Sequence, residues 1–146
     1  MKDRILNIIL WAAIILYILL VFSNSFQSAE ESIKRSKMTI NIIERFLEFF
    51  NIHVPITQRF IRKMAHYVEY TLLGIMLYVG FLKTNFKRKK PLVLTLVFGA
   101  IIPILDEFIQ FFSPGRKCSF ADMLIDFTGI LTGALFIFFI LKIIRT

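Results

Sequence analysis

The side chains of this sequence that could do chemistry are five acids and one histidine set inside or beside long apolar stretches. They are His66, Glu69, Asp106, Glu107, Asp122 and Asp126. A charged side chain at the centre of a bilayer costs about 2.5–3.5 kcal/mol, so such residues need partners or a water-filled cavity. Their presence predicts a polar site within a membrane protein.

The first group of these residues shares one face of a helix. Arg62, His66 and Glu69 follow one another at positions i, i+4 and i+7, and Lys63 lies beside them. An intramembrane glutamate next to a histidine favours a role in ligand binding or function. The alternative is a basic collar at the membrane surface, with the histidine and the glutamate simply paired.

The second group closes a later apolar stretch. Asp106 and Gln110 are one helical turn apart on one face, whereas Glu107 points about 100° away. Pro103 precedes them by one turn, and its missing NH predicts a kink or local opening of the helix.

A turn and a further pair of acids follow. Pro114 and Gly115 predict a turn. Arg116 comes next and could bind a carboxylate or a substrate phosphate in bidentate fashion. Asp122 and Asp126 then begin the last apolar stretch, one helical turn apart.

Four apolar stretches must position these residues. They cover residues 5–22, 64–82, 92–112 and 123–141, and each approaches or reaches the roughly 18–20 residues that cross a bilayer. Hydrophobic residues make up 57% of the 146 residues, and the mean hydropathy is +0.71. We therefore predict an all-α integral membrane bundle of four transmembrane helices, formed as a single domain by residues 1–146. Gly129 and Gly133 form a Gly-x-x-x-Gly pair that predicts close helix packing.

The first stretch follows Lys2 and Arg4, as a signal peptide would. It is longer than the usual apolar region of such a peptide, and no small-x-small cleavage site follows it, so we expect an uncleaved anchor. Cys118 is the only cysteine, which excludes an intrachain disulfide and a cysteine zinc cluster.

The segment between the first two spans, residues 23–63, is expected to be extracytoplasmic and helical. Ser28 and Glu31 form a capping box, which marks a helix start. Apolar residues then recur at helical spacing: Ile40, Ile43, Phe46, Leu47 and Phe50. This amphipathic helix either lies in the outer headgroup region or packs over the outer mouth of the bundle. We expect Pro55 to end it and Thr57 to cap the next helix.

Positive residues predict the orientation, because short basic loops stay on the cytoplasmic side. The link between the second and third spans holds Lys83, Lys87, Arg88, Lys89 and Lys90, and the two termini carry Lys2, Arg4, Lys142 and Arg145. Both termini are therefore expected in the cytoplasm, which places the acids and His66 at the outer ends of their spans. The net charge of +8 is explained by this pattern and possible contacts with anionic lipids, so no nucleic-acid partner is predicted.

The motifs resemble those of the VanZ-like family of small bacterial membrane proteins, which is named after a glycopeptide (teicoplanin) resistance determinant. They are Lys63-Met-Ala-His66-Tyr-Val-Glu69-Tyr70 with Leu73-Gly74, then Asp106-Glu107-x-x-Gln110 with Pro114-Gly115-Arg116, Ser119, Asp122 and Gly129 to Gly133. Ser25-Phe-Gln-Ser is a weaker match to a further family patch. The likeness covers most of residues 20–135, but this sequence has Asp126 where the family usually has Asn. The resemblance implies a protein of the bacterial cytoplasmic membrane linked to glycopeptide susceptibility, without a defined reaction.

Three classes of function fit these residues. The first is binding or modification of a lipid-linked envelope component, with membrane lipids, an envelope precursor or a glycopeptide as partners. The second is an ion- or proton-coupled transporter, and the third is a structural role in which acids and bases hold the helices together. The candidate ligand-binding residues are Arg62, Lys63, His66, Glu69, Asp106, Glu107, Gln110, Arg116, Asp122 and Asp126.

Catalysis would be a special case of the first class. His66 could act as a base or nucleophile oriented by Glu69 or Asp106, which makes these three the candidate catalytic residues. A divalent cation held by Asp106, Glu107 and Asp122 could instead activate water. Carboxylate oxygens would suit Mg²⁺ or Ca²⁺, and adding His66 would admit Mn²⁺ or Zn²⁺. The oligomeric state is left open.

Overall fold

The computed structural model describes residues 2–84 and 90–144, and all regular structure within them is helical. The helices are α1 (Lys2–Ser25), α2 (Ala29–Phe49), α3 (Gln58–Lys83), α4 (Lys90–Phe111) and α5 (Phe120–Ile144). Four of them, α1, α3, α4 and α5, are long and apolar enough to cross a membrane. The predicted all-α fold with four spans is therefore confirmed. Lys87, Arg88, Lys89 and Arg145, on which the predicted orientation partly depends, lie outside the described residues.

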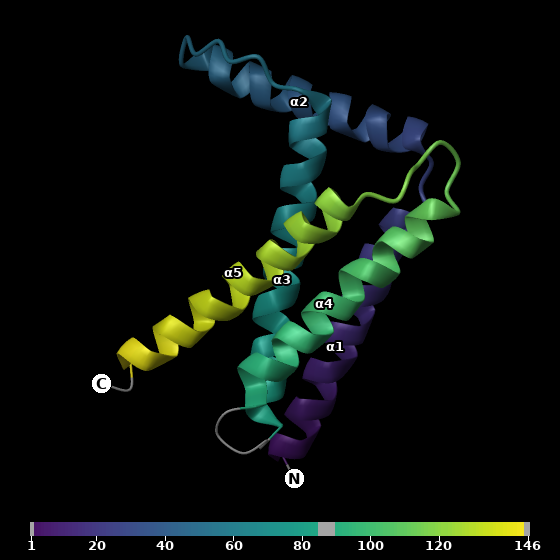
Figure 1. The fold of residues 1–146 in the computed structure, drawn as a ribbon. Coiled ribbons are helices and arrows are strands. Elements are labelled where there is room, and N and C mark those ends of the chain that lie inside the picture. The colour runs from purple at the N-terminus through teal and green to yellow at the C-terminus, as the bar shows by residue number, and fades with distance from the viewer. Residues whose placement is uncertain (1, 85–89, 145–146) are drawn as a thin grey trace.

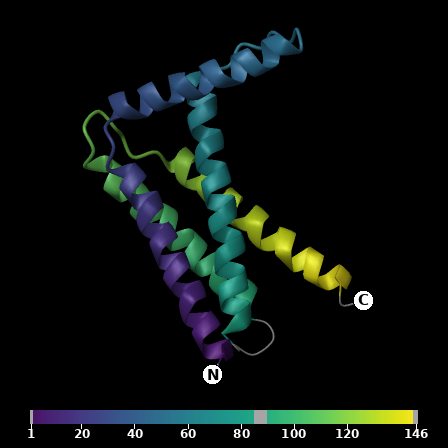
Figure 2. The ribbon, with the colours of Figure 1, turned by 180° about the vertical axis from the view of Figure 1, so that it is seen from behind.

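The spans form an open bundle with α2 across one end (Figure 1). α1 and α4 run side by side, and α3 packs against both of them and against α5. Seen from behind, α5 crosses α3 near the middle of α3 and then diverges from it (Figure 2). Four helix ends meet at the end of the bundle that α2 covers. They are the end of α1, the start of α3, the end of α4 and the start of α5.

Glycines allow α3 and α5 to touch backbone to backbone. A Cβ at Gly133 would fall on the carbonyl oxygen of Thr71, and one at Gly74 would fall on the carbonyl oxygen of Ile130. A Cβ at Gly129 would also lie only 2.7 Å from the Tyr67 carbonyl oxygen. The close packing predicted from the Gly-x-x-x-Gly pair is confirmed, and Gly74 supplies the matching surface of α3.

The hydrophobic core joins residues of α1, α3, α4 and α5. Its buried members are Ile14, Val21, Tyr70, Leu73, Leu77, Phe81, Ile102 and Ile130. At the opposite end from α2, the Trp11 indole NH donates to the Thr84 hydroxyl at 3.2 Å. α1 is thus a packed member of the bundle and not only an anchor.

α2 begins as predicted but ends earlier. The Ser28 hydroxyl accepts a hydrogen bond from the Glu31 NH at 3.2 Å, which completes the capping box. At the other end Asn51 has a φ of 55°, and the Ile52 NH donates to the Leu47 carbonyl at 3.0 Å. This is a Schellman-type C-cap, so the prediction that Pro55 ends the helix is wrong.

The next helix starts where the sequence predicted. The Thr57 hydroxyl accepts from the Phe60 NH at 3.2 Å and caps α3. α4 continues through Pro103 as one helix, so the helix does not break there, and the predicted kink stays a prediction.

The two halves of α2 have different surroundings, and only the predicted packing over the bundle is confirmed; the placement among lipid headgroups stays a prediction. Its first half packs on the bundle, since Ser36 and Ile40 are buried and the Ala29 NH donates to the Pro114 carbonyl at 3.0 Å. Its second half extends beyond α3 (Figure 1), and Phe46 and Phe49 are 65% and 83% exposed. The overhanging half therefore has apolar side chains available to contact lipid at this end of the spans.

Candidate functional site

The buried polar side chains gather at the end of the bundle that α2 covers. In the described ranges they are Ser25, Ser36, Asp106, Glu107, Gln110, Ser113 and Asp126, with Thr95 as the one placed elsewhere. They come from α1, α2, α4, α5 and the link after α4. The topology thus brings together residues that are up to a hundred positions apart in the chain.

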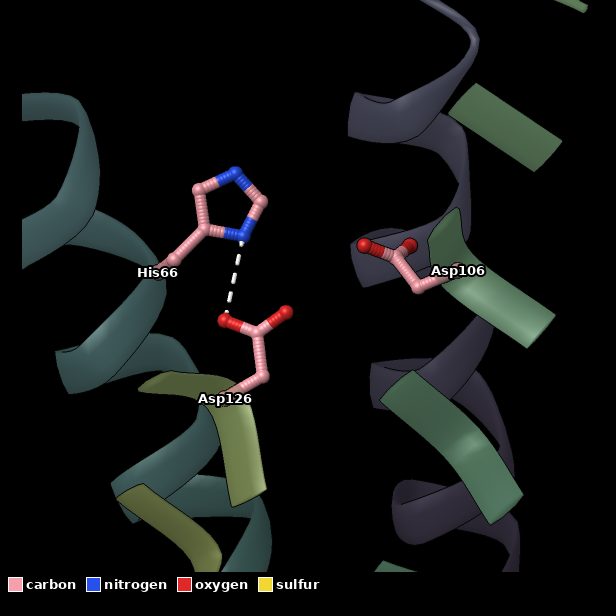
Figure 3. Close-up of side chains that lie close together, drawn as sticks. All are labelled: His66, Asp106 and Asp126. Carbon is pink, nitrogen blue, oxygen red and sulfur yellow. Dashed lines mark ion pairs between the residues drawn. The ribbon is translucent and has the colours of Figure 1, made fainter. Parts of the chain in front are cut away.

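At the centre of this group His66 of α3 faces Asp126 of α5 (Figure 3). The His66 Nδ1 lies 3.5 Å from an oxygen of Asp126, whose side chain is completely buried. Asp106 reaches toward the pair from α4, and one ligating atom from each of the three residues lies within 4.8 Å of the others. The prediction that Glu69 or Asp106 orients His66 is therefore wrong, because Asp126 is the acid beside its ring nitrogen.

Asp106 is held by hydrogen bonds from two helices. The Ser25 hydroxyl donates to one of its oxygens at 2.5 Å, and the Gln110 amide donates to the other at 2.9 Å. The Ser113 hydroxyl then fixes the backbone of Ser25 by donating to its carbonyl at 2.7 Å. The predicted shared face of Asp106 and Gln110 is confirmed, and the carboxylate is oriented on both sides.

Glu69 is held separately by the end of α1. The Asn24 side-chain amide donates to its carboxylate at 3.1 Å, and the side-chain Oδ1 of Asn24 accepts from the Arg35 guanidinium of α2 at 3.3 Å. The Tyr17 hydroxyl donates to the Glu69 backbone carbonyl at 3.1 Å. These bonds connect α1, α2 and α3 next to His66.

Glu107 and Asp122 face other partners. An oxygen of Glu107 accepts from the Ser119 NH at 2.6 Å, and Asp122 lies 3.5 Å from the Lys63 ammonium nitrogen. The expected grouping of Asp106, Glu107 and Asp122 around one cation is therefore wrong.

Two hollows lie under α2 above the histidine, and we call them together the vestibule. The larger has a volume of about 430 Å³ and the smaller about 140 Å³, and Arg62, His66 and Arg116 line both. The cationic side chains around the vestibule are Arg35, Arg59, Arg62, Lys63, Arg116 and Lys117. Glu69 lines the smaller hollow and Asp122 the larger, so basic side chains outnumber acidic ones around the vestibule.

Arg116 has no carboxylate partner within the described residues. One of its guanidinium nitrogens donates to the Ser25 carbonyl at 3.4 Å. Partial burial, and then the positive charge of Arg62, lower the pKa of Arg116, although a guanidinium stays protonated at neutral pH. Two guanidinium groups that line the same hollows favour the binding of an anion there.

Comparison with known proteins agrees with the motifs and the fold. A family model described as VanZ/LLP1 matches residues 9–142. The chain belongs to the VanZ/LLP1 family. No match was found among curated proteins or solved structures. With its four apolar helices, this VanZ/LLP1 protein is a multi-pass membrane protein.

Asn24, Ser25 and Tyr70 belong to this VanZ/LLP1 site but were not among the predicted site residues, although Ser25 and Tyr70 stand in the family motifs. Asn24 and Ser25 orient Glu69 and Asp106, and Tyr70 is completely buried one turn below His66. The available signal was the run of Ser, Asn and Gln side chains directly after the first apolar stretch. Such a polar run at the end of a span indicates side chains that turn back into the bundle.

Replacing Ser25 with alanine should destabilise the VanZ/LLP1 fold by about 1–3 kcal/mol, because it removes the hydroxyl that bonds a buried carboxylate. The free energy of unfolding can be measured by SDS titration in detergent. Ser23→Ala is the matched control, since Ser23 is exposed and its hydroxyl donates only to the Leu20 carbonyl of its own helix. Equal effects of the two changes would contradict a role for Ser25 in holding Asp106.

Proposed function

We propose that this VanZ/LLP1 protein binds the phosphate headgroup of a lipid-linked envelope component in its vestibule, and thereby contributes to glycopeptide (teicoplanin) resistance. The observation that carries the proposal is the cationic vestibule itself, placed at one end of four apolar spans. The site would face the outside of the bacterial cytoplasmic membrane.

Charge and size both favour a phosphate ligand. Lys63 is paired with Asp122, whereas Arg62 and Arg116 lack carboxylate partners among the described ion pairs. A planar guanidinium binds two phosphate oxygens at once. A volume of about 430 Å³ is within the usual range of small-ligand sites.

The position of the vestibule suits a ligand that stays in the membrane. The exposed apolar side chains of α2 lie at the same end, where an amphipathic helix would rest among the lipid headgroups. Lys2, Arg4 and Lys142 lie at the other ends of α1 and α5. Because positive ends stay in the cytoplasm, the vestibule would open outward with both termini inside.

The other two classes have less support. Transport needs polar groups through the membrane, but the core beneath the site is built from apolar residues such as Leu73, Leu77 and Ala134. The structural class is favoured by the Lys63–Asp122 and His66–Asp126 pairs, both of which join α3 to α5. That class accounts for these pairs and leaves Arg62 and Arg116 unexplained.

Binding of a polyprenyl diphosphate to the purified protein in phosphatidylcholine nanodiscs tests the proposal. Calorimetric titration should show saturable binding of the diphosphate and none of the uncharged polyprenyl alcohol. The double variant Arg62→Gln/Arg116→Gln should weaken binding at least about 100-fold, since hydrogen bonds to charged groups are worth about 1.5–3 kcal/mol each.

The matched control is Lys34→Gln/Arg45→Gln, which removes the same charge from exposed positions of α2 outside the vestibule. Its affinity should stay close to that of the wild type. An equal loss in both double variants would show general attraction of anions to a basic protein and would contradict the proposed site.

The orientation can be tested with Cys118, which lies exposed in the link between α4 and α5. A membrane-impermeant maleimide should label it from outside intact spheroplasts. Desolvation and the nearby Glu107 carboxylate raise the pKa of the Cys118 thiol, so less reactive thiolate exists at neutral pH. The labelling rate should therefore keep rising above the pH at which an ordinary cysteine levels off. Labelling only after lysis would show that the link between α4 and α5 faces the cytoplasm and would contradict the proposed orientation.

A further inference from the structure

We propose that His66, Asp106 and Asp126 form a binding site for one divalent transition-metal ion, Mn²⁺ or Zn²⁺, beneath the vestibule. This inference goes beyond the proposed function, because binding of a phosphate by Arg62 and Arg116 requires no metal ion. It stands on the geometry of three side chains from three different helices.

The three side chains converge closely enough to share an ion. One ligating atom from each lies within 4.8 Å of the other two, and Figure 3 shows the Asp106 and Asp126 carboxylates reaching toward the same space as His66. Ligand bonds to zinc are about 2.0–2.2 Å long, so two ligands of one ion lie at most about 4.4 Å apart. Small side-chain rotations would bring all three into contact with an ion.

Asp126 supplies an independent indication of a ligand. Its carboxylate is completely buried, yet neither oxygen accepts a hydrogen bond in the described part of the chain. Among the described residues the His66 Nδ1 is the one basic nitrogen within 4.0 Å of this carboxylate, at 3.5 Å, and it also lacks a hydrogen-bond partner there. Buried polar atoms normally have partners, because leaving them without one is costly. A bound ion would provide the missing contacts of both residues.

Charge and ligand chemistry agree with a divalent ion. Asp106 and Asp126 together bring two negative charges into a fully buried site, which a divalent ion would balance. One imidazole with two carboxylates suits Mn²⁺ or Zn²⁺ better than an all-oxygen set would.

The surroundings of Asp106 resemble the outer shell of a metal site. Ser25 and Gln110 donate to its two oxygens at 2.5 and 2.9 Å and fix the direction of the carboxylate. Hydrogen bonds of this kind orient metal-binding carboxylates. His66 lines both hollows of the vestibule, so an ion on its ring would be reached from there.

Mn²⁺ binding to the metal-free protein in phosphatidylcholine nanodiscs tests this site. Titration followed by electron paramagnetic resonance of free Mn²⁺ should give one saturable site per chain, from which Zn²⁺ displaces Mn²⁺ because it binds such ligands more tightly. His66→Gln and Asp126→Asn should each weaken binding at least about 10-fold, since even changes beyond the ligands cost 10–100-fold. Glu44→Gln is the matched control, because it removes one carboxylate from an exposed position of α2 outside the site, and it should change the affinity by less than about 3-fold since distant exposed charges are screened.

Absence of saturable Mn²⁺ binding by the wild type, or equal weakening by Glu44→Gln and Asp126→Asn, would overturn the metal site. If the variants do not fold, the spin-echo spectrum of Mn²⁺ bound to the wild type tests the metal site. The spin-echo spectrum of bound Mn²⁺ should show coupling to one imidazole nitrogen, and its absence would exclude His66 as a ligand.

Failure of this inference can be separated from failure of the proposed function. If polyprenyl diphosphate binds in the presence of EDTA and Mn²⁺ does not bind, the metal site is excluded and the anion site stands. If Mn²⁺ binds with the expected variant pattern and the diphosphate does not bind, the metal site stands alone.

Discussion

Gly133→Ala is expected to lower the free energy of unfolding by about 3 kcal/mol, at the upper end of the usual cost of overpacking. The added methyl group would fall on the carbonyl oxygen of Thr71, which belongs to the backbone of α3 and cannot rotate away. α3 and α5 would have to separate, and His66 would move from Asp126. SDS titration followed by circular dichroism measures the loss.

Gly80→Ala is the matched control for this change. The methyl group added there would lie 2.8 Å from the Ile14 Cδ1, the end of a flexible side chain that can turn aside. Its cost should stay below about 1 kcal/mol, within the range of tolerated core changes. Equal stability of the two variants would contradict the backbone contact between α3 and α5.

The double variant Arg62→Gln/Arg116→Gln should make cells that carry the protein as susceptible to teicoplanin as cells that lack it. These two guanidinium groups line both hollows of the vestibule, and their loss removes the groups that would bind phosphate oxygens. The minimal inhibitory concentration measures the effect, with immunoblots of membranes to confirm equal protein levels.

Lys34→Gln/Arg45→Gln provides the comparison in cells as it does in the binding experiment. Both side chains are exposed on α2, so resistance should be retained at the wild-type level. Retained resistance in the vestibule variant would separate the cationic vestibule from the phenotype and contradict the proposed function.

The four spans could be predicted because their apolar lengths match the thickness of a bilayer. The end at which the site lies was also predictable, since spans that alternate in direction bring Glu69, Asp106 and Asp126 to the same side. The partner of His66 could not be predicted. Which acid it meets depends on the crossing of α3 and α5, and that crossing depends on backbone contacts that become apparent only in three dimensions.

Local signals predicted helix starts better than helix ends. Ser28 caps α2 and Thr57 caps α3. Such a cap needs only a side-chain oxygen that reaches a free backbone NH three residues later, so it can be recognised from the local sequence. The end of α2 depends on Asn51 adopting a positive φ, which asparagine tolerates without requiring it. Pro55 was the stronger signal in the sequence, but the helix had already ended.

Native mass spectrometry of the protein purified from its own membrane tests the central claim, that the vestibule holds a lipid-linked phosphate. The wild type should carry a bound lipid with a phosphate or diphosphate headgroup, and Arg62→Gln/Arg116→Gln should lose it while Lys34→Gln/Arg45→Gln keeps it. If all three proteins carry only bulk phospholipid, in equal amounts, the claim is contradicted. The charged residues of the vestibule would then have a structural role.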